Sequence, residues 1–417
     1  MKPRTSYREI FQPAVIVGAL GYFVDIYDLI LFSIVRIPSL KDLGFSGDML
    51  VGHGILLLNL QMLGMLAGGI AFGILGDRRG RVALLFGSIL LYSVANIANG
   101  FVHSIEAYGV WRFIAGFGLA GELGGSVTLV SEVLSKETRA YGTTIVATVG
   151  VLGAVVGGLV AGLIPWRYAY FVGGGLGLLL LALRMSVVES GMFKQLRHSS
   201  SGVQRGNFLA LFTNAQRFGK YVRCILIGLP TWFVVGILVT FSPELSRALH
   251  IQGEVMPAHA VAFTYLGITL GGFASGWFSQ QIGSRKKIIF AFIVFTYTMT
   301  VAYLLCAGFS AATLYLVILL LGVGTGYWTV FVTVAAEQFG TNIRATVATT
   351  VPNFIRGSVV PLTLTFNWLK SQTLGGSPVG VVASAAVVGT LCTLISLWAL
   401  RGLDETHGKS LDYTEPL

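Results

Sequence analysis

The stretch VIVGALGYFVDIYDLILFSIV, from Val15 to Val35, is long and apolar enough to cross a lipid bilayer. A membrane-spanning helix needs about 20 apolar residues to match a hydrocarbon core of about 30 Å. The same stretch carries two carboxyl groups near its middle, on Asp25 and Asp28. A charge at this depth costs about 3 kcal/mol or more, so acids inside a membrane helix indicate a function.

The composition of the whole chain favours a membrane protein. Of its 417 residues, 54% are hydrophobic and 11% are charged, and the mean hydropathy is +0.77. A soluble protein of this length needs more charge on its surface. We therefore expect an all-α integral membrane protein with twelve spanning helices, over 13–37, 51–75, 82–102, 106–133, 141–163, 168–188, 220–242, 257–280, 287–308, 311–337, 345–369 and 379–400.

Basic residues are unevenly divided between the two expected membrane faces. If both termini are cytoplasmic, that side carries most of the 28 lysines and arginines. The cations left for the outer side are Arg36, Lys41, Arg167, Arg247 and Lys370. Because basic loops favour the cytoplasmic side, the formal charge of +10 reflects membrane orientation and not a nucleic-acid surface. The first helix is too long for a cleavable signal and lacks its small-residue cleavage site.

A polar stretch divides the expected helices into two sets of six. We predict an N-terminal bundle over 1–188, a cytoplasmic linker over 189–219, a C-terminal bundle over 220–401 and a cytoplasmic tail over 402–417. Two motifs recur in both halves: GILGDRRGR (73–81) matches GWFSQQIGSRKK (276–287), and SEVLSKETRAYGTT (131–144) matches AEQFGTNIRATVATT (336–350). Such repeats are typical of transporters that bind substrate between two halves near the bilayer midplane.

Several motifs resemble those of one family. GDRRGR (76–81) is similar to the loop signature of the major facilitator superfamily. Four further stretches resemble motifs of its metabolite:proton symporters, a group related to the sugar porters. They are WRFIAGFGLAGELGGSVTLVSE (111–132), PWRYAYFVGG (165–174), VVESGMF (187–193) and LDETHGKSLD (403–412). GYFVDIYDLILF (21–32) resembles helix 1 of these symporters and of phosphate:proton symporters. The resemblance implies two six-helix bundles around a central cavity.

Buried acids are the candidates for proton coupling. Asp25 and Asp28 are three residues apart and share a helix face with Gly18 and Gly21, so we expect both acids to point into the bundle. Glu122 lies among glycines near the middle of the fourth helix and is the third candidate. A buried acid escapes the cost of its charge by taking up a proton or by pairing with a cation. The alternative interpretation is a structural ion pair, for example with Arg112 or Arg356.

Buried cations are the candidates for binding substrate. Arg356 lies in the middle of the eleventh helix, and Arg112 lies nearer the outer side of the fourth. An arginine offers a planar fork that matches a carboxylate or a phosphate, which favours an anionic substrate. Pro352 and Pro361 flank Arg356 and suit a helix that bends during gating. Further candidates for substrate contact are Tyr22, Tyr327 and Asn353.

A third group of residues is expected to form a cytoplasmic gate. The family resemblance implies that polar residues at the helix ends latch that side in the outward-open state. In this chain they are Gly76, Asp77, Arg78, Gly80, Arg81, Glu132, Arg139, Glu189, Glu337, Arg344 and Glu405. The second copy of the loop motif has Gln280 where an acid is often found, so we expect a weaker latch in the second half.

The sequence offers no signs of enzyme chemistry. The glycine runs at 116–125 and 322–326 lie inside apolar helices, without the strand and the Lys-Ser/Thr of a phosphate loop. We find no catalytic triad and no metal-ligand spacing, and Cys224, Cys306 and Cys392 suggest neither a disulfide framework nor a metal site. We therefore expect no cofactor, and transport driven by an ion gradient and not by ATP.

These observations predict a proton-coupled symporter that imports a small polar metabolite, an organic anion, by alternating access. We expect it to act as a monomer in a bacterial inner membrane, with substrate, protons and lipid as its partners. Three alternatives stay open: a proton-antiport exporter of drugs or siderophore-like compounds, a carrier of a cationic, zwitterionic or phosphate substrate, and a substrate-sensing receptor that keeps the transporter fold.

Overall fold

The computed structural model of the chain describes residues 12–79, 81–126, 134, 139–189, 208–340, 343–372 and 377–407. These residues form helices and short connections, with no β-strand among them. The elements are α1 (Pro13–Asp42), α2 (Asp48–Arg79), α3 (Arg81–Asn99), α4 (Ile105–Leu119), α6 (Arg139–Leu163), α7 (Trp166–Glu189), the 3-10 helix η3 (Phe208–Leu211), α8 (Ala215–Ile227), α9 (Leu229–Phe233), the π-helix η4 (Val234–Val239), α10 (Ser242–Ala248), α11 (Pro257–Ile282), α12 (Arg285–Leu304), α13 (Ala311–Thr325), α14 (Trp328–Glu337), α15 (Arg344–Gly357), α16 (Val359–Gln372) and α17 (Pro378–Arg401).

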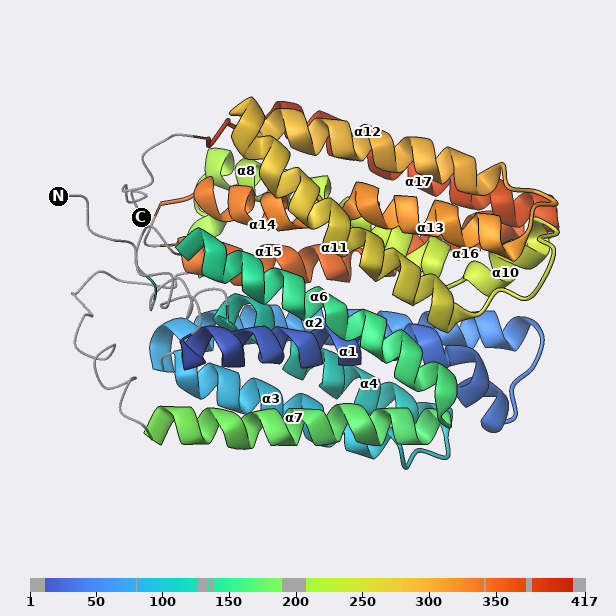
Figure 1. The fold of residues 1–417 in the computed structure, drawn as a ribbon, viewed down its shortest axis with the longest axis horizontal. Coiled ribbons are helices and arrows are strands. Elements are labelled where there is room, and N and C mark those ends of the chain that lie inside the picture. The colour runs from blue at the N-terminus through green and yellow to red at the C-terminus, as the bar shows by residue number, and fades with distance from the viewer. Residues whose placement is uncertain are drawn as a thin grey trace.

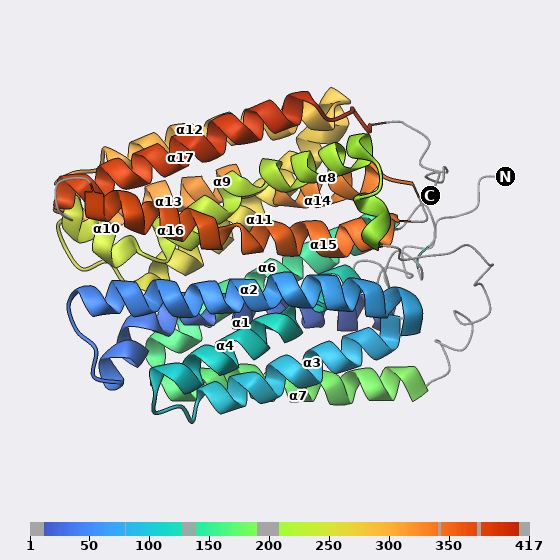
Figure 2. The same cartoon turned by 180° about the vertical axis from the view of Figure 1, so that it is seen from behind.

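The helices form two groups that run roughly parallel to one long axis. Helices α1 to α7 lie on one side and α8 to α17 on the other, as both views show (Figures 1 and 2). We call these groups the first half and the second half. Helix α1 begins and α17 ends at the same end of the molecule, on the left in Figure 1, which we call the terminal end. The opposite end, where α1 turns into α2, is called the far end.

The lengths of the helices suit a membrane. Within the described residues, nine helical segments are long and apolar enough to span a bilayer, and Leu84–Asn99 is a shorter apolar helix. Nine of the twelve predicted spans thus meet this criterion. The remaining three correspond to the shorter helix, to α4, and to α15 with α16. The count of twelve therefore stays a prediction.

Prolines explain two of the breaks in the spans of the second half. Pro361 cannot donate a backbone hydrogen bond to the carbonyl of Gly357, and the helix is interrupted between these residues, at Ser358. Pro230 has the same relation to Leu226, and α8 ends one residue later. Helix α8 begins at Ala215, five residues before the predicted start at 220, because Asn214 caps its free amides.

The two halves share one mode of helix packing. Where α2 meets α4, a Cβ added at Gly64 would lie 2.1 Å from the carbonyl oxygen of Phe113. Where α11 meets α13, a Cβ added at Gly267 would lie 2.1 Å from the carbonyl oxygen of Leu319. Glycine lets helix backbones approach this closely in membranes, where interfaces are rich in small residues. The equivalent contacts extend the repeat seen in the loop motifs to the helices themselves.

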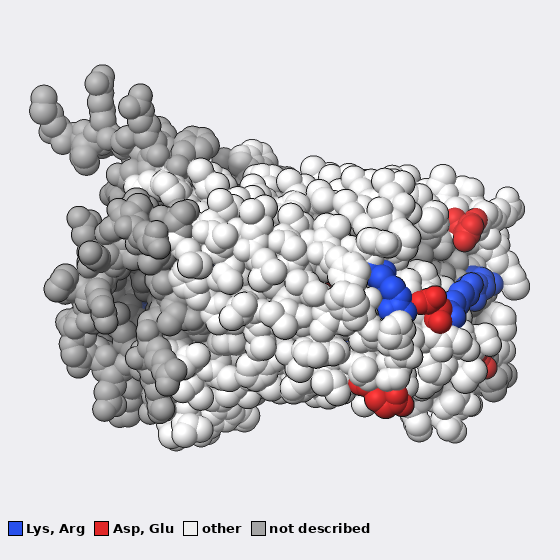
Figure 3. Space-filling model, turned by 90° about the horizontal axis from the view of Figure 1, so that it is seen from below, with Lys and Arg blue, Asp and Glu red and all other residues white. Residues whose placement is uncertain are grey.

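The surface of the described residues is apolar along its central part. Large hydrophobic side chains such as Trp277, Trp368 and Trp398 are exposed. On the face drawn in Figure 3, the charged side chains lie toward the far end, and the middle of the molecule shows none. A belt of this kind is suited to contact with lipid.

Candidate functional site

A buried acid and a buried arginine meet between the two halves. The Nη2 atom of Arg356, in α15, lies 3.9 Å from Oδ2 of Asp25, in the middle of α1. The two side chains are 1% and 0% exposed. Within the described residues neither oxygen of Asp25 has a hydrogen-bond partner, so the pair is close but loose. The predicted structural alternative, a pairing of Asp25 with Arg356, is thus present in the geometry.

Aromatic side chains surround this pair. The guanidinium of Arg356 lies 5.9 Å from the centre of the Trp232 ring. Tyr22 of α1 faces Arg356 and Trp328, and Tyr265 of α11 interacts with the same arginine. A planar cation among aromatic rings forms a site that can accept a planar anion.

On the terminal side of the pair, the halves touch through α15. The amide of Asn353 donates a 2.9 Å hydrogen bond to the carbonyl of Ala120. A Cβ added at Gly124 would lie 2.3 Å from Oγ1 of Thr349, so α15 packs directly on the first half. Asn353, a predicted substrate contact, lies one turn from Arg356 and accepts a 3.4 Å bond from it.

On the far side, a second set of contacts joins the halves. Arg36 of α1, which is fully buried, donates to both carboxylate oxygens of Glu244 in α10, at 2.7 and 2.8 Å. Ser33 and Thr240 share a 2.9 Å hydrogen bond, and Thr363 donates a 2.7 Å bond to Asn59. The two halves are therefore in contact on both the terminal side and the far side of Asp25 and Arg356.

Asp28 lies inside the first half and not at the interface. A Cβ added at Gly173 of α7 would lie 2.1 Å from Oδ1 of Asp28, and the amide of Asn96 in α3 faces the same carboxyl. In the described part of the chain, Asp28, Asn96 and Asn99 all have buried polar atoms without a hydrogen-bond partner. The two acids that share a helix face in sequence thus enter different surroundings.

Arg112 is buried close to Asp28 but binds neutral groups. Its Nη2 atom donates to Oε1 of Gln61, and its Nη1 donates to the hydroxyl of Tyr170 at 3.4 Å. The guanidinium also lies 4.6 Å from the centre of the Phe32 ring. Arg112 acts on the Asp28 carboxyl through space and forms no ion pair with it in this conformation.

Glu122 has a partner that we did not predict. Arg184 of α7 donates to both carboxylate oxygens of Glu122, with the Nη1–Oε2 distance at 3.2 Å, and Ser126 donates to Oε1 at 2.8 Å. Both charged side chains are buried. The signal was present in the sequence: Arg184 is a lone cation in the apolar run LLLLALRMSVV (178–188).

Tyr327 lies within the second half. Its hydroxyl donates a 2.8 Å hydrogen bond to the carbonyl of Ile227 and is fully buried. The hydroxyl is therefore already satisfied by the backbone. Trp232 and Trp328, which sequence analysis did not select, lie nearer to Arg356 and Tyr22.

The predicted gate is only partly within the described residues. Gly80 and Glu132 lie outside them, and of Gly76, Asp77, Arg78, Arg81, Arg139 and Glu189 only the helical backbone is described. In the second half, Arg285 pairs with Glu337, and Arg344 donates to the carbonyl of Phe339 at 3.1 and 3.2 Å. Gln280 is exposed, so these contacts form without it.

Glu405 caps the start of α12. It accepts a 2.6 Å hydrogen bond from Ser284 and backbone bonds from Arg285, Lys286 and His407. Partial burial alone raises the pKa of this carboxyl, but the hydrogen bonds outweigh burial and lower the pKa from 4.5 to about 2. This predicted gate residue thus ties the chain after α17 to α12.

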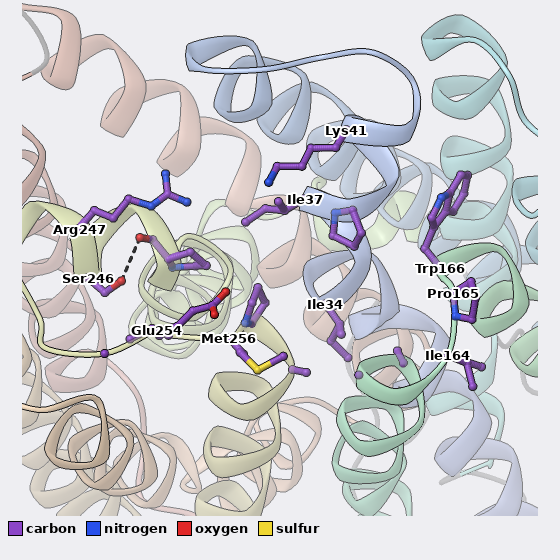
Figure 4. Close-up of a pocket in the computed structure, with 18 of the residues that line it drawn as sticks. Ile34, Ile37, Lys41, Ile164, Pro165, Trp166, Ser246, Arg247, Glu254 and Met256 are labelled. Atoms are coloured by element: carbon purple, nitrogen blue, oxygen red, sulfur yellow. Dashed lines mark hydrogen bonds between the residues drawn. The ribbon is translucent and has the colours of Figure 1, made fainter.

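A cavity of about 570 Å³ opens between the halves at the far end. Its walls include Pro38 and Lys41 of α1, Trp166 of α7 and Arg247 of α10. Figure 4 shows Lys41 and Arg247 reaching toward one another from the two halves, with Glu254 below them. The rest of the lining is largely apolar.

The described residues contain no group of three or more His, Cys, Asp or Glu side chains able to hold a metal ion. Cys224, Cys306 and Cys392 are free and buried. The chemistry of the buried sites is thus that of carboxyl, guanidinium, amide and hydroxyl groups.

Comparisons with known proteins agree with this architecture. The model of the Major Facilitator Superfamily matches residues 18–360. The gentisate transporter of Corynebacterium glutamicum is 26% identical, over 80% of this chain and 75% of that protein. The cis,cis-muconate transport protein of Acinetobacter baylyi is 27% identical, over 66% of this chain and 67% of that protein.

Among solved structures, a D-xylose-proton symporter superposes with a TM-score of 0.70 at 16% identity, covering 97% of this chain and 100% of that one. At this identity the likeness concerns the fold. Together with the family match and the transporters among its relatives, it shows a transport protein of the membrane and not an enzyme. The chain belongs to the major facilitator superfamily.

Proposed function

We propose that the protein is a proton-coupled symporter that takes up a small organic anion. The observation that carries this proposal is the loose pair of Asp25 and Arg356, buried between the halves at 3.9 Å. A charged Asp25 neutralises Arg356, whereas a protonated Asp25 leaves the guanidinium free to bind an anion. A proton and an anion therefore favour each other's binding at this site.

The surroundings of Arg356 support an organic anion. Its planar fork matches a carboxylate, and Trp232, Tyr22 and Trp328 offer flat apolar surfaces for the body of the substrate. Relatives named as transporters of gentisate and of cis,cis-muconate favour the same class. Asn353 is the other expected contact, and we assign Tyr327 to packing.

The other buried charges take different roles in this proposal. Asp28 is a second proton site, with Arg112 as the cation that stabilises its charged form. Glu122 is held by Arg184 and belongs to the framework of the first half. This division follows from hydrogen-bond number, because a doubly bonded carboxylate is costly to protonate whereas one without partners is not.

Transport follows by rocking of the two halves. We place the terminal end in the cytoplasm of a bacterial cell, with twelve spans and a monomeric carrier in the inner membrane. Loss of the far-side contacts, including Arg36 with Glu244, opens the site to the outside, and loss of the α15 contacts opens it to the cytoplasm. Protons and substrate leave together where the proton concentration is lower.

Uptake by reconstituted vesicles tests the proposal. Radiolabelled gentisate and cis,cis-muconate are offered to proteoliposomes with and without an inside-alkaline gradient. We expect accumulation only with the gradient, and none by Asp25→Asn or Asp28→Asn, although both variants still exchange labelled for unlabelled anion. Asp42→Asn, an acid-to-amide change at the protein surface, is the matched control. Equal accumulation with and without the gradient would rule out proton coupling.

A further inference from the structure

Three buried hydroxyl groups form a chain through the first half. Tyr108 of α4 donates to Oγ of Ser39 in α1 at 3.3 Å, and the hydroxyls of Tyr108 and Tyr170 lie 2.7 Å apart. Arg112 donates to the hydroxyl of Tyr170 at 3.4 Å. All four side chains are fully buried.

The direction of this chain follows from the count of protons. A tyrosine hydroxyl has one proton, and that of Tyr108 is given to Ser39. Tyr170 must therefore be the donor to Tyr108, while it accepts from Arg112. Tyr170 thus points its proton to Tyr108 and Tyr108 points its proton to Ser39, while Ser39 donates to the carbonyl of Arg36 in its own helix at 3.1 Å.

The outer end of the chain lies behind the wall of the far-end cavity. Pro38, next to Ser39, lines that cavity. Trp166, labelled in Figure 4, lines it too. The ring of Trp166 lies 6.0 Å from that of Tyr108 and 6.2 Å from that of Tyr170. Ser39 itself is fully buried and does not line the cavity, so outside water reaches it only when this wall opens.

The inner end of the chain lies beside Asp28. Gly173, one turn after Tyr170 on α7, packs directly against the Asp28 carboxyl. Tyr170 and Arg112 both interact electrostatically with that carboxyl. The other titratable groups facing Asp28 are Asp25 and Tyr27 from α1 and Tyr92 from α3.

We propose that Ser39, Tyr108 and Tyr170 relay protons from the far-end cavity to Asp28. The relay rests on the role of Asp28 in the proposed function and runs inside the first half, apart from the interface where the anion binds. Ser39 gains a proton from hydronium in the cavity and passes its own to Tyr108. Tyr108 passes one to Tyr170, and Tyr170 passes one to the Asp28 carboxylate. Each hydroxyl ends with one proton, hydronium becomes water, and the carboxyl becomes neutral.

The observed orientation of the two tyrosine hydroxyls is the one left after such a transfer, since the proton of Tyr170 points to Tyr108 and that of Tyr108 points to Ser39. The last link is broken in this conformation, because in the described structure no hydrogen bond reaches either oxygen of Asp28. For the next transfer Arg112 must release Tyr170, whose hydroxyl then turns to Asp28. An interrupted path is what coupling requires, because a continuous one would leak protons.

Infrared spectroscopy after a pH step tests the relay without any transported substrate. The full-length protein is placed in liposomes, and the carbonyl band of protonated Asp28 is identified by its loss in Asp28→Asn. Tyr108→Phe and Tyr170→Phe each remove one hydroxyl and keep the ring. Tyr303→Phe is the matched control, because its buried hydroxyl donates to the Leu238 carbonyl in the second half and lies outside the chain.

We expect the Asp28 band to rise more slowly in both relay variants, by about tenfold or more, with an unchanged final amplitude. The control should follow the wild type. Wild-type rates in Tyr108→Phe and Tyr170→Phe, equal slowing in Tyr303→Phe, or no Asp28 band in the wild type would each overturn the relay. Gentisate uptake is measured separately. A protein in which the relay works but the gradient drives no uptake would therefore contradict the proposed function and not the relay.

Discussion

The buried arginines differ at the scale of the single residue in how their charge is compensated. Arg184 holds Glu122 by two hydrogen bonds, Arg112 donates to the neutral Gln61 and Tyr170, and Arg356 lies beside Asp25 without a hydrogen bond to it. A doubly bonded pair resists exchange of either partner. A loose pair exchanges its carboxyl for another anion at smaller cost. By this difference we assign the pair of Arg184 and Glu122 to the framework and that of Arg356 and Asp25 to the binding site.

Removal of Arg184 should destabilise the fold. Arg184→Met leaves the Glu122 carboxylate buried and unpaired, which typically costs about 3–5 kcal/mol. We expect a clear fall in the melting temperature of the purified protein, measured by intrinsic fluorescence. The double variant Glu122→Met/Arg184→Met should recover most of the lost melting temperature, since both buried charges are then removed. A wild-type melting temperature for Arg184→Met would show that the pair carries no stability.

At the scale of the element, close backbone contacts set the packing of α11. Gly267 packs against the carbonyl of Leu319 in α13, whereas Gly276 on the same helix meets nothing within 4 Å. A helical glycine is free to become alanine only in the second situation, because a methyl group at the first would overlap the neighbouring backbone.

Gly267→Ala should therefore destabilise the second half, by about 1–3 kcal/mol as overpacked sites do. Gly276→Ala, on the same helix, should be neutral or stabilising, because alanine is the better helix former by about 1 kcal/mol. Thermal unfolding in detergent compares the two. Equal melting temperatures would show that the close contact between Gly267 and the Leu319 carbonyl does not limit the packing of α11 on α13.

Glu405 offers a pH-dependent test at the end of α12. Its pKa is lowered from 4.5 to about 2 in the folded protein, so the folded state binds this proton less readily than the unfolded chain. The stabilisation is fully present above about pH 4.5 and is lost as the pH falls toward 2. Because the group is only partly buried, we expect about 1 kcal/mol or less, as for other carboxylates at helix N-termini.

The measurement is the melting temperature of wild type and of Glu405→Gln across this range. The difference between them should be greatest near neutral pH and shrink as the pH falls below 4.5. A difference in melting temperature that stays constant across this pH range would show that the charge of the carboxylate is not its cause.

At the scale of the whole molecule, the far-side contacts decide whether the site is open to the outside. Arg36 is buried against Phe241, with its guanidinium 4.5 Å from the ring centre, and is bound by Glu244 across the two halves. Hydrogen bonds to charged groups are worth about 1.5–3 kcal/mol, so this contact alone shifts the balance of states about tenfold or more.

Glu244→Gln should therefore shift the protein toward a state open at the far end. Spin labels at Ser46→Cys and Gln252→Cys, in a variant without the three native cysteines, report the distance between the halves. We expect a longer distance in Glu244→Gln. Asp42→Asn is the control, because it breaks an ion pair with Arg167 that lies within the first half. Unchanged distances in Glu244→Gln would show that Arg36 and Glu244 do not hold the halves together.

Residues that lie near one another in sequence were the ones whose arrangement could be predicted. The apolar spans, the helix break before Pro361 and the burial of Asp25, Asp28 and Glu122 follow from hydropathy and helix geometry, whereas Pro352 lies inside the unbroken helix α15. The partners of these acids did not follow, because they come from helices far along the chain. Arg184 was missed for this reason, although it stands out as a charge among leucines.

The sequence by itself determined that this is an all-helical membrane protein of two related halves with acids inside the first span, because these properties depend on local hydrophobicity and on repeated motifs. Only the tertiary structure decided that Asp25 faces Arg356 between the halves, that Asp28 faces Asn96 within one half, and that Glu122 is bound by Arg184. The physical reason is that helix rotation and neighbour choice depend on packing between distant segments, and a turn of one residue moves a side chain about 100° around its helix.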